Sequence, residues 1–224
     1  MNAWWIPPAV AMFEAVFRPA MSMCLQVRLR ADSGIDPTGA VVFVSNHHSW
    51  WDGFLVRELH RKLMPSSPLW SVMLERELAP RGWLRRLGCL GVSPGEGSSV
   101  RRLLRDLSEI SHRPKPWAVS YFPQGCIRPA GTRPLGFRSG LERMLPAMGD
   151  VQVVPVALRI EPLNTRRPHA FIWAGAPLER KKSGGTWALR ELETALESHL
   201  DALDKELVEL AEHASLRWPG EIRS

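Results

Sequence analysis

Short apolar runs alternate with segments of helical spacing along most of this chain. The run at residues 41–44 has no polar interruption, which is typical of a strand buried on both faces. Similar runs predict further strands at residues 69–73, 117–122, 151–160 and 170–174, and alternating apolar and polar residues predict a half-exposed strand at 25–30. Helical spacing predicts one helix that ends before Pro65 and another from Ser98 or Ser99 to Ile110. This alternation predicts an α/β domain with crossover connections.

The two ends of the chain carry helical patterns of different kinds. Residues 9–23 predict a helix with one apolar side, and we divide the chain into a membrane-interfacial helical segment at 1–24 and a domain at 25–224. The alternative is that this first helix packs on the domain. No apolar run reaches the roughly 18–20 residues that span a bilayer, and the N-terminus lacks the features of a signal peptide. The lipid-facing candidates are the aromatic residues Trp4, Trp5, Phe13 and Phe17.

Residues 186–216 give the longest predicted helix. Leucines recur in it every three or four residues, which favours a core-packing face over an oligomerisation seam. Its polar positions are strongly acidic, whereas residues 81–105 are rich in arginine. A chain polarised in this way is expected to meet an anionic partner on one face.

Composition narrows the choice of that partner. The net charge is +6, and the chain has ten tryptophans against one tyrosine. Tryptophan prefers the membrane interface, so we expect an anionic lipid surface as the partner rather than nucleic acid. Three widely spaced cysteines without a Cys-x-x-Cys pair favour reduced thiols in a cytosolic setting. We therefore expect a peripheral protein on the cytoplasmic face of the cell membrane.

The residues that could carry out a reaction come directly after the strand predicted at residues 41–44. Ser49-x-x-Asp52 has the form of a capping box at a helix start, and His47 lies in the loop before it. The Asp52 carboxylate can turn back to the Nδ1 side of His47 and leave Nε2 free to accept a proton. This is the orienting half of a Ser-His-Asp triad without the serine, so the activated hydroxyl would belong to a substrate. The alternative is a helix cap and a loop histidine with no catalysis.

Four segments together carry a family resemblance. Asn46-His47-His48-Ser49-Trp50-Trp51-Asp52 resembles the Asn-His-x-Ser-x-x-Asp signature of the glycerolipid acyltransferase family, whose type members acylate lysophosphatidic acid. Leu74-Glu-Arg-Glu-Leu78 resembles the family's Lys-x-Glu-Leu segment, Phe122-Pro123-Gln124-Gly125 its Phe-Pro-Glu-Gly motif, and Val153-Val-Pro155-Val its late strand. The resemblance covers about residues 40–160 and implies a single mixed-sheet α/β domain of the glycerolipid acyltransferase type. The helical patterns at the two ends of the chain further predict an N-terminal interfacial helix and a long C-terminal helix.

The resemblance also implies the reaction and its residues. It implies an O-acyltransferase that moves a fatty acyl group from acyl-CoA or acyl-carrier protein to a lipid-type hydroxyl. His47 would be the general base and Asp52 would orient it. The thioester is a co-substrate, and neither a cofactor nor a metal ion is expected. The substrate-binding candidates are Asn46, Ser49, Phe122, Pro123, Gln124, Gly125 and Arg128.

Three positions depart from the family pattern. Gln124 replaces a glutamate, Ile127 stands where the third motif has arginine, with Arg128 one place later, and Pro94 falls near the arginine of the second motif. The family uses these charged groups to hold the glycerol phosphate. We therefore predict a neutral acceptor, such as a glycolipid or a carotenoid or other terpenoid glycoside, with lysophosphatidic acid or another lysophospholipid as the alternative.

Three other interpretations of the site remain. One is a non-catalytic protein that binds acyl lipids, although the intact His47 and Asp52 pair argues against it. Cys126 as an acyl-transfer nucleophile and a metal site that includes His60 have no supporting sequence around them.

Overall fold

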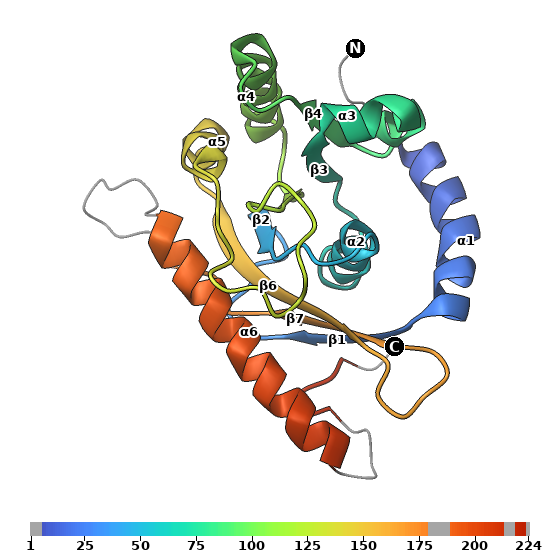
Figure 1. Cartoon of the computed structure of the whole chain (residues 1–224). Helices are drawn as coiled ribbons and strands as arrows, with labels where there is room; N and C mark the ends of the chain where they lie inside the picture. The colour runs from blue at the N-terminus through green and yellow to red at the C-terminus, as the bar shows by residue number, and fades with distance from the viewer. Residues whose placement is uncertain (1–5, 179–188, 213–217, 223–224) are drawn as a thin grey trace.

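A computed structural model of the chain shows a mixed sheet with helices on both faces (Figure 1). The structure describes residues 6–178, 189–212 and 218–222, and within them the sheet has seven strands in the order β1-β7-β6-β2-β5-β3-β4. Neighbouring strands are parallel except for β6 and β7, which are antiparallel. The strands are β1 (Gln26–Ala31), β2 (Ala40–Ser45), β3 (Leu69–Leu74), β4 (Cys89–Val92), β5 (Trp117–Tyr121), β6 (Gln152–Glu161) and β7 (His169–Ala174).

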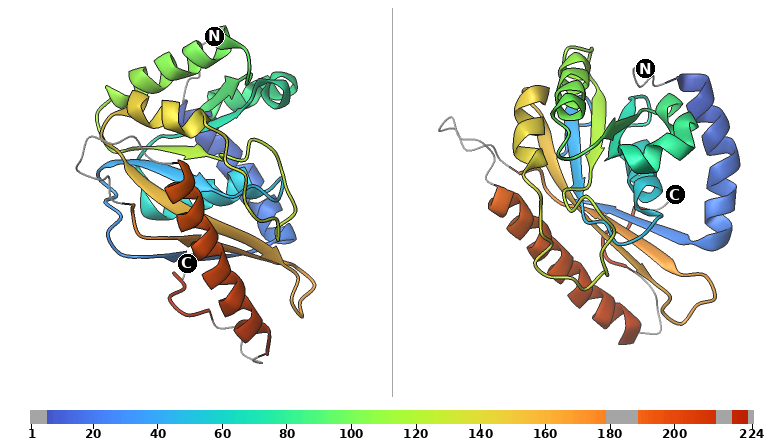
Figure 2. Two further views of the ribbon diagram at one scale, coloured as in Figure 1. Left: turned by 60° about the vertical axis from the view of Figure 1, so that its left-hand side comes forward. Right: turned by 45° about the horizontal axis from the view of Figure 1, so that its top comes forward.

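The helices cover the two faces of the sheet unequally. The helices are α1 (Pro7–Cys24), α2 (Asp52–Leu63), α3 (Glu75–Leu78), the 3-10 helix η1 (Ala79–Arg86), α4 (Gly97–Ser111), α5 (Gly140–Met148) and α6 (Leu189–Glu212). Side chains of α1 and α2 pack on one face, and those of α4, α5 and α6 pack on the other, so α1 and α6 lie on opposite sides of the molecule (Figures 1 and 2). The predicted single mixed-sheet α/β domain with a long C-terminal helix is confirmed. None of the described helices is both long enough and apolar enough to span a membrane.

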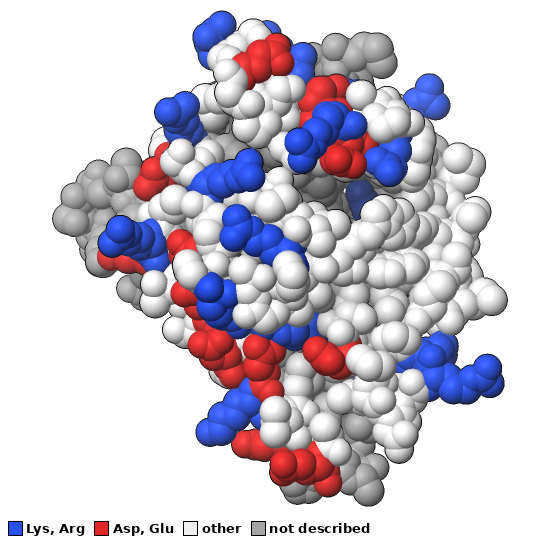
Figure 3. Space-filling view, in the orientation of Figure 1, with Lys and Arg blue, Asp and Glu red and all other residues white. Residues whose placement is uncertain are grey.

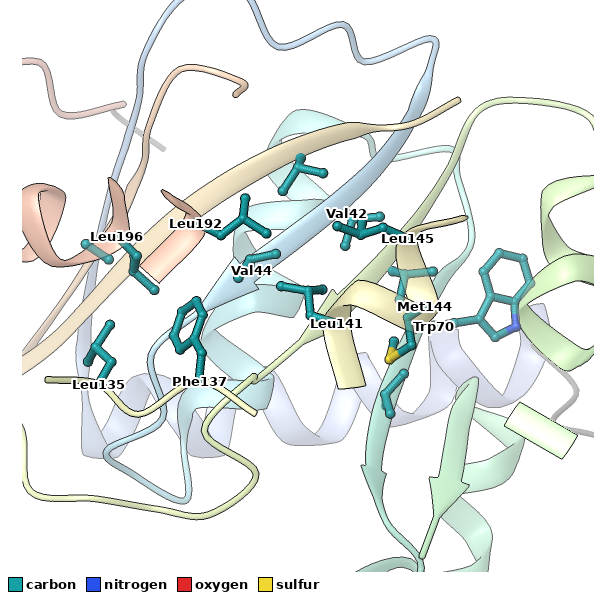
Figure 4. Close-up of a cluster of buried hydrophobic side chains, with 14 of the residues drawn as sticks. Val42, Val44, Trp70, Leu135, Phe137, Leu141, Met144, Leu145, Leu192 and Leu196 are labelled. Atoms are coloured by element: carbon teal, nitrogen blue, oxygen red, sulfur yellow. The ribbon is translucent and has the colours of Figure 1, made fainter. Parts of the chain in front are cut away.

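Strand β2 lies at the centre of the sheet, with β6 on one side and β5 on the other. All six of its residues are buried, as the uninterrupted apolar run predicted. Val42 and Val44 face the larger core, where they pack with Leu141 and Leu145 of α5 and with leucines of α6 (Figure 4). The strand is thus held from both faces and both edges, which fixes the position of the loop that follows it.

Helix α6 contributes a leucine stripe to this core. The six leucines 192, 196, 200, 203, 207 and 210 are buried, which confirms a core-packing face. Several of the acidic side chains of α6 form internal pairs. Asp204 accepts two hydrogen bonds from Arg159 at 2.6 and 2.7 Å, and Glu206 accepts from Arg30 at 2.9 Å. The acidic pattern of this helix therefore serves partly to bind it to the sheet.

The sequence left one helix unpredicted, and two predictions about local structure are wrong. Residues 140–148 form α5, whose Pro146 and flanking glycines hid its pattern. Helix α4 begins without a serine cap, because the Ser99 hydroxyl accepts from the Ser93 N–H instead, at 2.9 Å. Strand β1 is not half-exposed, since Arg28 is buried and donates to both carboxylate oxygens of Glu221, at 3.0 and 2.6 Å.

The arginine-rich stretch at residues 81–105 is less free than its sequence suggests. Arg85 and Arg102 both approach the Glu75 carboxylate, and Arg81 lies beside Glu77. Arg105 lies near Asp106 and Glu109. Acidic residues outside the stretch therefore offset part of its positive charge.

Helix α1 turns its phenylalanines toward the domain. The Phe17 ring lies 4.1 Å from that of Phe54 and the Phe13 ring lies 5.6 Å from that of Trp83, measured between centroids, so both rings are partly buried, and their contact with lipid stays a prediction. The exposed apolar residues of α1 are instead Met12, Val16 and Met23, at 70, 71 and 76% exposure. Trp4 and Trp5 lie outside the described residues.

The buried His60 near the end of α2 gives the fold a predictable pH dependence. Its Nε2 donates to the Ser67 hydroxyl at 2.8 Å, and that hydroxyl donates to the carbonyl of Met64 at 3.0 Å. Burial, aided by the nearby charge of Arg57, lowers the pKa of His60 from 6.5 to about 3. Between these two values the unfolded chain binds a proton that the folded chain does not, so His60 makes the free energy of unfolding decrease as the pH falls.

We expect His60→Gln to flatten this dependence. In the wild type, His60 lowers the free energy of unfolding by at most about 1.4 kcal/mol for each pH unit of acidification. The variant should lack this contribution between about pH 4 and 6. Urea unfolding followed by circular dichroism at several pH values measures the difference. A His60→Gln protein that loses stability as steeply as the wild type would contradict the assignment.

Candidate active site

The candidate site lies where two neighbouring parallel strands end. Val44 of β2 pairs with Tyr121 of β5, so both strands deliver their following loops to the same edge of the sheet. One loop carries Asn46 to Trp51, and the other begins at Phe122. The crevice beyond the carboxyl ends of strands is where open α/β sheets commonly bind ligands.

His47 and Asp52 form the expected pair. Asp52 Oδ2 lies 2.9 Å from His47 Nδ1, and the Asp52 side chain is fully buried. A carboxylate offers only acceptors, so Nδ1 must donate and the lone pair of Nε2 is left available. The same Oδ2 accepts from the backbone N–H groups of His48 and Ser49, at 2.6 and 2.8 Å. The predicted return of the Asp52 side chain to the preceding loop is therefore present, and three donors stabilise its buried charge.

Ser49 has a local structural contact. Its hydroxyl accepts from the backbone N–H of Trp51 at 3.1 Å, two residues along rather than three. The α2 helix begins at Asp52 with Trp51 before it, so the capping box is displaced from the predicted form.

His48 differs from His47 in its electrostatics. Burial lowers the pKa of His48, which outweighs the raising effect of Asp52. Its Nδ1 lies 3.4 Å from Asp52 Oδ1. A neutral His48 leaves the negative charge of Asp52 to act on His47.

The two buried amides, Asn46 and Gln124, are bonded within the protein. Asn46 donates to the carbonyl of Leu158 at 3.1 Å and accepts from its N–H at 2.9 Å, which ties the loop to β6. Gln124 accepts from the His47 N–H at 2.6 Å and donates to the carbonyl of Leu135 at 3.2 Å. Both side chains are 2% exposed. Their expected role as direct substrate contacts has no support in this geometry.

A tight turn follows β5. The Gly125 N–H donates to the carbonyl of Phe122 at 3.0 Å, with the buried Pro123 at the second position. The Phe122 ring packs 4.6 Å from the His47 ring, measured between centroids. The N–H of Gly125 is thus engaged in the turn, whereas those of Cys126 and Ile127 donate to no residue within the described part of the chain.

Comparison with known proteins identifies the family. A family model described as Acyltransferase matches residues 26–159, from β1 to the end of the site-forming part of β6. The chain belongs to the acyltransferase family. Comparison with curated protein sequences gives no significant match. The family match supports an acyltransferase enzyme and does not identify the acceptor.

Two arginines of this acyltransferase flank the turn after β5. The guanidinium group of Arg128 lies against Gly136, where a Cβ atom would come within 2.9 Å of Arg128 Nη1. The side chain of Arg138 lies against Gly125, whose φ of +65° also favours glycine. Neither guanidinium forms a hydrogen bond or an ion pair with another residue that the structure describes. Ile127 is 52% exposed and Pro94 lies in an exposed turn, and neither can replace a missing arginine because both side chains are apolar and uncharged.

Sequence reasoning missed two parts of the site. Arg138 follows the motif by more than ten residues and carries no pattern of its own, so only the fold returns it to Gly125. Trp50 and Trp51 stand at variable positions of the motif, and their rings, 6.4 and 6.0 Å from that of Phe17, link the loop of His47 to α1. The signal for the tryptophans was available, since two adjacent aromatics before a helix are unusual for a polar loop.

Two rival interpretations find no support in the geometry. The Cys126 thiol approaches the carbonyl of Gln124 at 3.7 Å and makes no contact with His47. His60, which a metal site would need, lies with Ser67 at the far end of α2. Among the described residues no group of three or more His, Cys, Asp or Glu side chains could hold a metal ion, and the expected absence of a metal stays a prediction.

Proposed function

We propose that this acyltransferase moves a fatty acyl group from a thioester carrier to a lipid hydroxyl, with His47 as general base. The observation that supports this most strongly is the pairing of His47 Nδ1 with the buried Asp52, which leaves Nε2 available. In the proposed reaction the acceptor hydroxyl gives its proton to Nε2 and its oxygen attacks the thioester carbonyl carbon. The C–S bond then breaks, and the leaving thiolate takes the proton from the imidazolium.

Backbone donors after the turn would stabilise the tetrahedral intermediate. The negative charge on the carbonyl oxygen needs N–H groups that are oriented before the reaction. The Gly125 N–H is engaged by Phe122, so the candidates become the N–H groups of Cys126 and Ile127. Both belong to the segment that Arg128 anchors, because its N–H donates to the carbonyl of His47 at 2.9 Å.

Arg128 and Arg138 could bind phosphate of either the acyl donor or a phosphorylated acceptor. Acyl-CoA and the prosthetic group of acyl-carrier protein both carry phosphate, which the unpaired Arg128 and Arg138 could bind. We assign these arginines to the donor and propose a neutral acceptor, a glycolipid or a terpenoid glycoside such as a carotenoid glycoside. The second candidate is a lysophospholipid acyltransferase, which the unpaired Arg128 favours if it holds the acceptor phosphate.

A peripheral position on the cytoplasmic face of the membrane fits the surface of α1. Its exposed apolar residues Met12, Val16 and Met23 follow one stripe of the helix, and Trp50 and Trp83 are exposed beside it. Figure 3 shows a broad area without charged side chains on this side of the molecule, with Lys and Arg at its edges. Lipid would cover the apolar side chains while the basic residues meet anionic headgroups.

The first prediction for this function concerns the base. His47→Ala should lower thioester-dependent acyl transfer by at least ~10²-fold, and Asp52→Asn by a similar order, because the base is lost or misoriented. The measurement is thiol release from acyl-CoA in the presence of acceptor, with folding checked by circular dichroism. His112→Ala, at an exposed histidine after α4, is the matched control and should keep wild-type turnover. Near-normal turnover in folded His47→Ala protein would exclude the mechanism.

The second prediction concerns the acceptor. Purified protein given labelled acyl-CoA should acylate glycolipid acceptors in preference to lysophosphatidic acid and other lysophospholipids. Arg128→Ala and Arg138→Ala should raise the KM for acyl-CoA, because each removes a charge-assisted contact of about 1.5–3 kcal/mol. Efficient, saturable acylation of lysophosphatidic acid, with its KM raised in the Arg128→Ala protein, would replace this assignment with the lysophospholipid one.

The third prediction concerns the membrane. The protein should sediment with anionic liposomes, and high salt should release part of it. Val16→Asp should weaken sedimentation, because a charge would enter the apolar stripe of α1. Val208→Asp is the matched control, since Val208 is 60% exposed on α6 at the opposite side of the molecule. Equal sedimentation of both variants would argue against the α1 surface.

A further inference from the structure

The backbone of His47 is held on both sides by the turn after β5. Its N–H donates to Gln124 Oε1 at 2.6 Å, and its carbonyl accepts from the Arg128 N–H at 2.9 Å. Asp52 fixes the imidazole itself through Nδ1. Two of the three contacts come from the turn after β5 and the third from the start of α2, so the position of the ring depends on how these segments are joined.

Gln124 is the side chain that joins them. Its Oε1 reaches the loop after β2, and its Nε2 donates to the carbonyl of Leu135 at 3.2 Å. The N–H of Leu135 in turn donates to Glu197 of α6 at 2.7 Å. A continuous series of hydrogen bonds therefore connects α6, through Leu135 and Gln124, to the peptide group of His47.

We infer that Gln124 is a positioning residue for His47, and that its neutral amide is required for this. The inference rests on the proposed role of His47 as the base. Gln124 is 2% exposed and both of its polar atoms are engaged within the protein, so it acts through His47 rather than on substrate. It is a different role from the substrate contact that the motif suggested.

The chemistry of the two partners explains why an amide is needed. The His47 N–H requires an acceptor, and the Leu135 carbonyl requires a donor. An amide supplies both at any pH, whereas a carboxylate has acceptors only and would face the Leu135 carbonyl with its lone pairs. A protonated carboxyl group could again supply one acceptor and one donor. A glutamate at this position would therefore support His47 only while it holds a proton.

A second glutamine of the chain provides a matched control. Gln152, at the start of β6, accepts from the Asp36 N–H at 2.8 Å and donates to the carbonyl of Gly34 at 3.2 Å. It makes the same kind of bridge between an N–H and a carbonyl, at the end of the strands opposite to the one that carries His47. Gln152→Glu thus reproduces the chemical change without the connection to the base.

The test compares kcat and the acceptor KM of Gln124→Glu, Gln124→Met and Gln152→Glu with the wild type across a range of pH. In Gln124→Met the side chain keeps its length but loses both bonds, and kcat should fall by about 10²-fold with little change in KM, as expected for a displaced base. In Gln124→Glu the ratio of its kcat to that of the wild type should be highest at acid pH and fall through one ionisation as the pH rises. Gln152→Glu should keep the wild-type kcat at every pH, even if its melting temperature changes.

Three outcomes would overturn the inference while leaving the proposed function intact. They are a ratio for Gln124→Glu that does not change with pH, a wild-type kcat in folded Gln124→Met, and an increase in acceptor KM at constant kcat, which would indicate a substrate contact. These outcomes bear on Gln124 only if His47→Ala has abolished turnover. An active His47→Ala protein would refute the proposed function itself, so the two failures are distinguishable.

Discussion

The fully buried carboxylate of Asp52 is the constraint on which the site depends. A charge without solvent must be compensated by hydrogen-bond donors, and here three donors meet one oxygen, Oδ2: His47 Nδ1 and the N–H groups of His48 and Ser49. Two of the three are backbone groups, so the loop must curl around the carboxylate in one conformation. The third donor is the imidazole, which is thereby held in one tautomer. The hydrogen bond from His47 Nδ1 that helps to compensate the buried charge of Asp52 therefore also leaves Nε2 free to accept a proton.

The central position of β2 extends this constraint to the rest of the fold. Parallel pairing of β2 with β5 brings the turn after β5 next to the loop of His47, and pairing with β6 brings Leu158 to Asn46. The leucine stripe of α6 packs on one face of the same sheet, and the acids of α6 bind the segment that holds Gln124 in place. Local chemistry at the loop is thus supported by contacts between segments that lie far apart in the sequence.

The sequence predicted those features that depend on short-range patterns. The buried strand β2, the Asp52 side chain turning back to His47 and the leucine stripe of α6 all arise from residues within a few positions of each other. It failed where long-range contacts decide. Arg28 looked exposed because Glu221, its partner, is almost two hundred residues away, and the packing of Phe13 beside Trp83 joins residues too far apart in the sequence to be foreseen. Binding to a membrane and the identities of the acyl donor and the acceptor remain predictions, since neither the fold nor the family match tests them.

The comparison of Gln124 with the family's glutamate shows how a motif changes meaning once the geometry is known. From the sequence, the loss of a charged residue suggested a weaker phosphate site. In the structure this side chain faces a peptide N–H and a carbonyl, where a carboxylate would lose one of the two bonds. Because Gln124 is buried and both of its polar atoms bond within the protein, its replacement of a glutamate is no argument about phosphate in either direction. The case for a neutral acceptor therefore depends on Ile127 and Pro94, while Arg128 and Arg138, which pair with no other described residue, are the cations that we propose for phosphate binding.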